Sequence, residues 1–351
     1  MQGYGRFGCK RMKKVIHLGP ADSRGGMSMV IHNLALNTPV NYQSEIITTH
    51  CEGAILKKIN IWINARNILK NKINANEVDI VHIHATHSIS WWRKINLMNI
   101  CKKNSIPVII HIHSGRFQDF CKGFFGISGF LVRRSLATEC RVIVLEDRWK
   151  EILKKWMPND VIVIPNSSER TVSRKNILSK KIKILMLSRK SKGKGHDFAI
   201  KILRSLESKG INVKLTMTGV DDNYIKKIKS SSIDAKGWVT KEEKMELIKE
   251  SDFLIMPSEF EGSSMSVIES MINCLPCLVS PASSETVGIN ELVIPLDRVE
   301  EWSDKIISLT NQDEYDKIIK LINLQSEKYS KYNNKQNIEK LYDEISLPKQ
   351  Q

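Results

Sequence analysis

Two glutamates occupy positions from which they could bind a hydroxyl-rich, anionic substrate. Glu261 lies in a polar loop directly after the apolar run 253–256, and Glu269 follows after seven intervening residues, inside a segment with helical apolar spacing. A carboxylate in such a loop can face a sugar, and one early in a helix can accept hydrogen bonds from vicinal hydroxyls such as those of ribose. Both can equally be solvated carboxylates that stabilise the positive end of the helix macrodipole.

Two cations and a pair of glycines could bind phosphate. Arg189 and Lys194 lie five positions apart in a glycine-bearing loop after the apolar run 182–187. There an arginine can bind a diphosphate through two parallel hydrogen bonds, and a lysine adds a point charge; a solvated basic loop is the alternative. Gly25 and Gly26 precede a predicted helix, where glycines let phosphate approach the backbone, although such a pair also occurs in plain turns.

Histidines at the end of an apolar run raise the possibility of a metal site. His82, His84 and His87 have the H-x-H-x-x-H spacing that can chelate zinc from one strand end. Thr86, however, stands where hydrolases with this motif usually carry Asp, and the later sequence has no obvious acidic bridging ligand. Histidines that line a cleft or bond to the backbone are the other interpretation.

Alternating strands and helices must position these residues. Short apolar runs bounded by turns are typical of buried parallel strands, and apolar residues at helical spacing separate them. This alternation in both halves predicts two parallel sheets with right-handed crossovers, which bind ligands at the carboxyl ends of their strands. Strands are predicted at 13–18, 79–84, 108–113, 161–164, 182–187, 213–218, 253–256 and 277–279, and helices at 27–36, from 196, at 242–250, from 265 and within 299–346.

Length and composition are those of a soluble two-domain protein. The chain has 351 residues, of which 41% are hydrophobic and 26% charged. No apolar run approaches the ~20 residues of a membrane-spanning helix, and no secretory signal is apparent. Seven cysteines without a regular framework predict a reducing cytosol. Residues 1–11 lack periodicity and precede Met12, so they are predicted to be a disordered extension.

The charge is concentrated in the first half. Residues 1–178 hold 27 Lys and Arg against 12 Asp and Glu, a net charge of +15, whereas the remainder has a net charge of +1. A basic half predicts an anionic partner, namely nucleic acid, lipid headgroups or a pyrophosphate-bearing acceptor. Nucleic acid is not expected, because no helix-turn-helix, zinc-finger or RNP signature occurs. Five of the nine phenylalanines lie within 117–130, which predicts either a buried helix or a patch at a membrane interface.

The run E-G-S-S-M-S-V-I-E-S-M-I-N-C-L-P-C-L-V-S, from Glu261, resembles the Glu-(x)7-Glu signature of retaining family 4 glycosyltransferases, especially bacterial capsule and exopolysaccharide members. The resemblance covers about residues 13–345 and implies an α/β protein of GT-B fold. Two Rossmann-like domains would face each other across a cleft, with the last helix crossing back to the first. The implied parts are an extension at 1–11, an acceptor domain at 12–170, a donor domain at 171–330 and the returning helix at 331–351.

The resemblance also implies residue roles. Glu261 would lie by the donor sugar, Glu269 would bind the ribose, and His113, at a strand end, would contact the sugar. Cys274 stands where the family often has a left-handed Gly, a conformation that costs other residues roughly 1 kcal/mol. The catalytic set would be Glu261, His113, Arg189 and Lys194, and the donor-binding set Gly25, Gly26, Arg189, Lys194, Glu261, Gly262, Ser263, Ser264, Glu269 and, in a short strand at 236–239 against the nucleobase, Trp238 and Val239.

The expected function is that of a retaining, metal-independent glycosyltransferase without a cofactor. It would move a sugar from a nucleotide-diphosphate sugar to a polyprenyl-pyrophosphate-linked saccharide, in capsule, exopolysaccharide or O-antigen biosynthesis. Its basic first domain would bind the anionic inner face of the cell membrane, which makes the protein cytoplasmic and peripheral. The alternative is a metal-dependent hydrolase that uses His82, His84 and His87.

Overall fold

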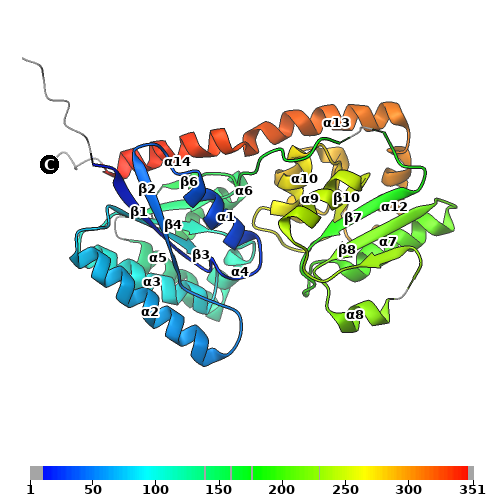
Figure 1. Ribbon diagram of the computed structural model, residues 1–351. Helices are drawn as coiled ribbons and strands as arrows, with labels where there is room; N and C mark the ends of the chain where they lie inside the picture. The colour runs from blue at the N-terminus through cyan, green and yellow to red at the C-terminus, as the bar shows by residue number, and fades with distance from the viewer. Residues whose placement is uncertain (1–10, 138–139, 159, 175–176, 229, 347–351) are drawn as a thin grey trace, which may run out of the picture.

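Two parallel sheets, each covered by helices, make up the computed structural model, which describes residues 11–137, 140–158, 160–174, 177–228 and 230–346. Figure 1 shows the two halves side by side, with α13 (Gln312–Ser326) and α14 (Lys331–Ser346) running along one side of both. Of the predicted disordered extension only Arg11 is described, and it pairs with Asp79 at 2.6 Å; the rest lies outside the described residues.

The first sheet has six strands in the order β2-β1-β3-β4-β5-β6. Its central strands are buried throughout, which is why they read as continuous apolar runs. The strands are β1 (Lys13–Gly19), β2 (Tyr42–Thr48), β3 (Ile80–Ala85), β4 (Val108–Ile112), β5 (Arg141–Val144) and β6 (Val161–Val163), and the helices are α1 (Gly26–Leu36), α2 (Ile55–Asn74), α3 (Ile89–Lys103), α4 (Phe117–Lys122), α5 (Ile127–Leu136) and α6 (Asp147–Leu153).

The second sheet has five strands in the order β11-β10-β7-β8-β9. Its core is continuous with residues of the first half, such as Val30 and Ile109, so the two halves pack against each other. The strands are β7 (Ile182–Leu187), β8 (Val213–Thr218), β9 (Ile233–Ala235), β10 (Phe253–Met256) and β11 (Cys277–Val279), and the helices are α7 (His196–Ser208), α8 (Asp222–Lys227), α9 (Lys241–Glu250), α10 (Met265–Ile272), α11 (Ser284–Val287) and α12 (Val299–Ser308).

The predicted strand at 236–239 is wrong. The pairing of β9 with β8 ends at Ala235, and the chain then bends. The carbonyls of Lys236 and Gly237 accept hydrogen bonds from the loop after β8, at Val220 and Gly219, instead of continuing the ladder. The other predicted strands are present with ends shifted by at most one residue, and Cys274 has the predicted left-handed backbone, with φ at 60°.

The predicted return of the last helix to the first half is confirmed. On α14, the Asn334 side chain donates to the Pro165 carbonyl at 2.8 Å. The Tyr342 hydroxyl lies 2.9 Å from Nδ1 of His82, and Asp343 accepts a hydrogen bond of 2.6 Å from Tyr42. These contacts fix the end of the chain to the first sheet.

The aromatic segment is buried in one part, as the interpretation of a buried helix predicts, and exposed in another, where the membrane-interface patch stays a prediction. On α4, Phe117 is fully buried and Phe120 packs against the core. At the turn between α4 and α5, Phe124 and Phe125 are exposed, as is Phe130 on α5. No helix among the described residues has the length and apolar character needed to cross a membrane.

Removing the hydroxyl of Tyr342 should destabilise the fold. Tyr342→Phe leaves a buried nitrogen of His82 without its partner, which costs about 1–3 kcal/mol. The control is Tyr332→Phe on the same helix, where the ring is 69% exposed and the change should stay within about 0.5 kcal/mol. Denaturant unfolding measures both, and equal free energies for the two variants would contradict the assigned contact.

Candidate functional site

A cavity of about 650 Å³ lies between the carboxyl ends of the two sheets. Both halves contribute to its wall, as parallel sheets that face each other at their carboxyl ends require. It brings together every residue that the sequence analysis assigned to the site: Gly25, Gly26, His113, Arg189, Lys194, Trp238, Val239, Glu261, Gly262, Ser263, Ser264 and Glu269. The structure thus places them at one site, and their individual roles stay predictions.

Lys194 and Glu261 form an ion pair in this wall. The ammonium lies 2.6 Å from Oε1 of Glu261, whose side chain is 12% exposed. The turn that carries Lys194 ends at Gly195, which has φ at +80°, and a Cβ there would lie 2.0 Å from the Pro257 carbonyl oxygen. Only glycine fits at this position, so the two loops can approach closely enough for the pair to form.

Glu269 forms a second, more deeply buried pair. It lies on α10, is 4% exposed, and its two carboxylate oxygens are 2.6 and 2.7 Å from Nζ of Lys244. Burial raises the pKa of Glu269, and the positive charge of Lys244 opposes that rise. Lys244, on α9, also lines the cavity and was not predicted. No local pattern marks it, because its partner is 25 residues away in the chain.

Arg189 connects the second sheet to the loops of the first. It follows β7, and its guanidinium contacts the Arg24 carbonyl and lies 3.0 Å from Oε1 of Glu52. The same group lies 5.6 Å from the ring centre of Trp238, which also lines the cavity. The acidic partner Glu52 was also missed by the sequence analysis, because it lies in a loop without a recognisable motif.

His113 is the cavity end of a buried histidine cluster. Its Nε2 lies 2.9 Å from Nδ1 of His84, and Nε2 of His84 lies 3.1 Å from Nδ1 of His17. His82 and His111 form a neighbouring contact of 3.2 Å. Burial lowers the pKa of all five, that of His17 to about 4 and that of His113 to about 3. All five are therefore neutral near pH 7, so His113 offers the cavity a polar ring without a charge.

The predicted metal-binding set of His82, His84 and His87 is not formed. His82 and His84 alternate on β3 and therefore point to the same face of the sheet, whereas His87 lies beyond the strand end. Its Nδ1 is 2.6 Å from the Ser114 hydroxyl. Among the described residues, the groups whose nitrogens are near enough to share an ion are His17, His82 and His84, and His84, His111 and His113. Neither group is the predicted one.

Acid should destabilise the protein through this cluster. A histidine with a lowered pKa binds fewer protons folded than unfolded, so its contribution to stability is lost as pH falls below about 6.5. From pH 7.5 to 5.5 each of the five should lower the free energy of unfolding by about 1 kcal/mol. Glu146 acts in the opposite direction, because burial raises its pKa to about 7.

Denaturant unfolding at the two pH values measures this loss, and His17→Asn, which removes one of the five histidines, should show a smaller one. A stability that is level or rising as the solution becomes more acidic would contradict the assignment of neutral rings.

Comparisons with known proteins agree with this architecture. Residues 167–325 match the family model described as "Glycosyl transferases group 1". A 41.2 kDa protein from the cps region of Klebsiella pneumoniae is 20% identical over 77% of this chain and 81% of its own length.

Two solved structures share the fold. Sucrose-phosphate synthase from Thermosynechococcus elongatus is 12% identical and has a TM-score of 0.76, with 95% of this chain and 99% of that chain covered. HepE of Anabaena, solved in complex with UDP and glucose, is 12% identical with a TM-score of 0.71, over 95% and 100%. The predicted GT-B fold and the resemblance to glycosyltransferases are confirmed.

Proposed function

Because residues 167–325 match the family model described as "Glycosyl transferases group 1", we propose that the protein transfers a sugar from a nucleotide-diphosphate sugar to a lipid-linked saccharide, with retention of configuration. The observation that carries the proposal is the meeting of Arg189, Lys194, Glu261 and Glu269 at one cavity between the sheets. In a donor that combines a diphosphate, a ribose and a sugar, the cations would bind the diphosphate, and the carboxylates would accept hydrogen bonds from the ribose and the sugar.

The diphosphate would lie at the carboxyl end of β7 and β10. Arg189 and Lys194 supply positive charge there, and the first turn of α10, which begins at Met265, adds main-chain N–H groups. Charge develops on the diphosphate as its bond to the sugar breaks, so these groups stabilise the transition state more than the bound donor. Because the two cations and the helix supply this stabilisation, the proposal includes no metal ion.

The nucleoside would extend from the diphosphate towards α9. Glu269 can accept hydrogen bonds from the two ribose hydroxyls, and the positive charge of Lys244 favours the ionised form of its buried carboxylate. Trp238 is 49% exposed in the same wall and offers a ring face to the nucleobase. The complex of HepE with UDP and glucose supports a nucleoside diphosphate sugar as the donor class.

The sugar would lie between Glu261 and His113. His113 is a hydrogen-bonding partner for it, since its low pKa rules out a positive charge at neutral pH. The acceptor hydroxyl attacks the anomeric carbon on the side from which the diphosphate leaves. The proton of the acceptor hydroxyl passes to an oxygen of the departing phosphate, so the charge balances without a separate catalytic base.

Substitutions in the cavity should separate donor binding from turnover. Arg189→Ala and Glu269→Ala should each weaken nucleoside diphosphate binding at least tenfold, because each loses a charged hydrogen bond of about 1.5–3 kcal/mol. Glu261→Ala should lower turnover and leave the fold intact. Calorimetric titration with UDP, GDP and ADP, followed by turnover of the corresponding nucleotide sugars, measures both effects.

Arg204→Ala is the matched control, because Arg204 is an exposed arginine of α7 outside the cavity. The residue roles are refuted if Arg189→Ala binds all three nucleotides as tightly as Arg204→Ala does, or if Glu261→Ala turns over at the unaltered rate.

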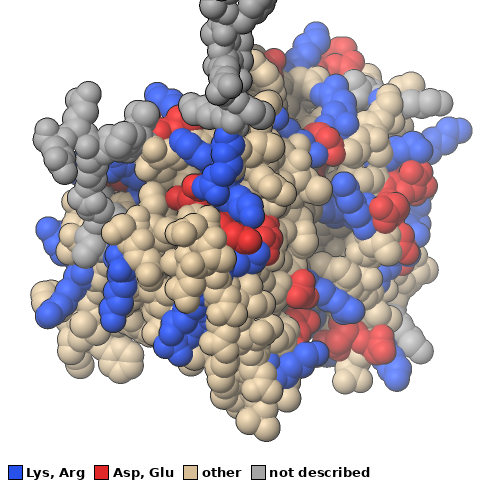
Figure 2. Space-filling view, turned by 60° about the vertical axis from the view of Figure 1, so that its left-hand side comes forward, with Lys and Arg blue, Asp and Glu red and all other residues tan. Residues whose placement is uncertain are grey.

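The first half would carry the lipid-linked acceptor at an anionic membrane. Its excess of Lys and Arg supports this, although Figure 2 shows the basic side chains spread over the face that it draws instead of in one patch. A more localised feature is the turn at Phe124 and Phe125, which are 81% and 106% exposed, with Arg133 and Arg134 on the following helix. Aromatic rings at acyl depth with cations at the headgroups bind such a surface.

Exposed aromatic residues at this turn should determine membrane binding. Phe124→Ser with Phe125→Ser should reduce co-sedimentation with vesicles that contain anionic lipid, because the rings no longer insert. Leu324→Ser, which removes a 65% exposed apolar side chain from α13, should bind vesicles as the unaltered protein does. If the unaltered protein ignores anionic vesicles at low salt, the membrane proposal fails while the donor site is unaffected.

A further inference from the structure

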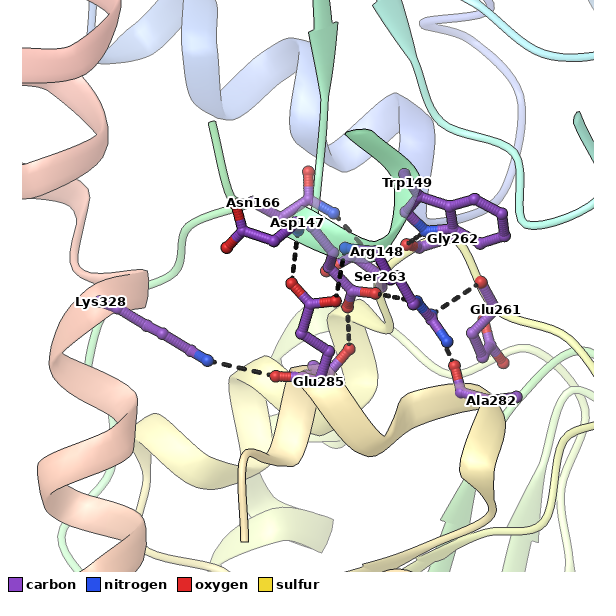
Figure 3. Close-up of polar contacts among 12 residues, drawn as sticks. Asp147, Arg148, Trp149, Asn166, Glu261, Gly262, Ser263, Ala282, Glu285 and Lys328 are labelled. Carbon is purple, nitrogen blue, oxygen red and sulfur yellow. Dashed lines mark hydrogen bonds and ion pairs between the residues drawn. The ribbon is translucent and has the colours of Figure 1, made fainter. Parts of the chain in front are cut away.

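Three side chains of the first half hold three consecutive carbonyls of the loop that carries Glu261. The guanidinium of Arg148 donates to the Glu261 carbonyl at 3.2 Å, and the indole N–H of Trp149 donates to the Gly262 carbonyl at 2.6 Å. The Asn166 amide lies 3.4 Å from the Ser263 carbonyl. Figure 3 shows these side chains reaching the loop from the elements on its first-half side. Among the described residues, no main-chain N–H donates to these three carbonyls.

The same loop also touches the first half through glycine. A Cβ on Gly115, in the loop after β4, would lie 2.4 Å from the carbonyl carbon and oxygen of Glu261. A Cβ on Gly262 would lie 2.5 Å from the His113 carbonyl oxygen. The loop of the second half therefore meets the first half in two ways, through hydrogen-bond donors and through closely packed backbone.

Helix α6, which carries Arg148 and Trp149, is itself fixed to the second half. The carboxylate of Glu285, on α11, accepts from the main-chain N–H of Asp147 at 2.5 Å and of Arg148 at 3.0 Å. Arg148 also donates to the Ala282 carbonyl at 2.7 Å and forms an ion pair with the buried Glu146 at 2.7 Å. Figure 3 shows Glu285 pointing at the start of α6 across the boundary between the halves. The direction of the Arg148 side chain is thus set from several sides.

From this geometry we infer that Arg148, Trp149 and Asn166 are positioning residues for the Glu261 loop. They set its main chain, and with it the Glu261 carboxylate, only when the two halves are docked. The sugar end of the donor site is thereby assembled by both halves, whereas Arg189, Glu269 and Trp238 would bind the nucleotide from positions outside this loop. This inference rests on the proposed function for its catalytic consequence and on the contacts alone for its effect on the loop.

Trp149→Phe tests the inference directly, because it keeps a ring and removes the one N–H donor. Losing a hydrogen bond of about 1 kcal/mol corresponds to about a fivefold change in an equilibrium. Hydrogen exchange of the segment 258–266, read by mass spectrometry, should therefore be about fivefold faster. In a nucleotide-sugar assay kcat should fall about fivefold, with the donor KM and the UDP dissociation constant changed less than twofold.

Arg148→Lys is the second variant, since a lysine keeps the charge beside Glu146 but cannot reach two carbonyls at once. Trp302→Phe is the matched control. It removes the same kind of bond, from an indole N–H to the Pro295 carbonyl at 2.9 Å, from a site outside the cavity. It should leave exchange at 258–266 unchanged.

Faster exchange of 258–266 in both Trp149→Phe and Arg148→Lys, and not in Trp302→Phe, supports the inference. If Trp149→Phe exchanges faster along the whole chain, it has lost the fold, and Arg148→Lys decides alone. Unchanged exchange of this segment in Arg148→Lys and Trp149→Phe overturns the inference. A protein that uses no nucleotide sugar would refute the proposed function, and the exchange result would still stand by itself.

Discussion

A loop without regular structure has to hold a carboxylate at a fixed place between two domains. The main-chain carbonyls of such a loop have no ladder or helix to satisfy them, and leaving a buried carbonyl without a partner costs about 1–3 kcal/mol. In this protein the partners of residues 261–263 come from the opposite half, through Arg148, Trp149 and Asn166. The need to satisfy one loop therefore links the geometry of the candidate sugar site to the docking of the two sheets.

Charge pairing shapes the same cavity. Three cations of the cavity wall form ion pairs with carboxylates. Lys194 and Arg189, which are expected to bind the diphosphate, pair with Glu261 and Glu52, and Lys244 pairs with Glu269. A diphosphate that enters the cavity would compete with Glu261 and Glu52 for these cations. The pair of Glu269 is the most buried of the three, and desolvation makes an unpaired charge there the most costly. In the proposed function, donor binding would exchange the partners of Arg189 and Lys194 and would add ribose hydroxyls to the pair of Glu269 and Lys244.

The histidine cluster shows how polar rings can be buried without charge. Five imidazoles from β1, β3, β4 and the residue just after β4 contact one another, and burial keeps them neutral. Each ring contacts another ring, and one of them contacts a hydroxyl of the returning helix at Tyr342. Through these contacts the cluster connects α14 to the end of β4, where His113 lines the cavity.

The sequence by itself determined the parts of the structure whose causes are local. The run from 253 to 279 predicted a strand, a polar loop, a helix and a strand, and β10, α10 and β11 follow because apolar runs and helical spacing act over a few residues. The edge strand β2 was missed, since its exposed polar side chains interrupt the apolar run. The assignment of 236–239 to a strand failed, because carbonyls there pair with a neighbouring loop.

Only the tertiary structure decided the contacts between distant segments. The partner of Glu269 is on another helix. The side chains that donate to the carbonyls of the Glu261 loop lie more than 90 positions earlier in the chain. His87 contacts the Ser114 hydroxyl instead of lying beside His82. No periodicity records such pairs, because they arise from how two sheets stack and not from how one segment folds. The sequence therefore predicted which residues lie at the site, whereas packing determined their hydrogen-bond and ion-pair partners.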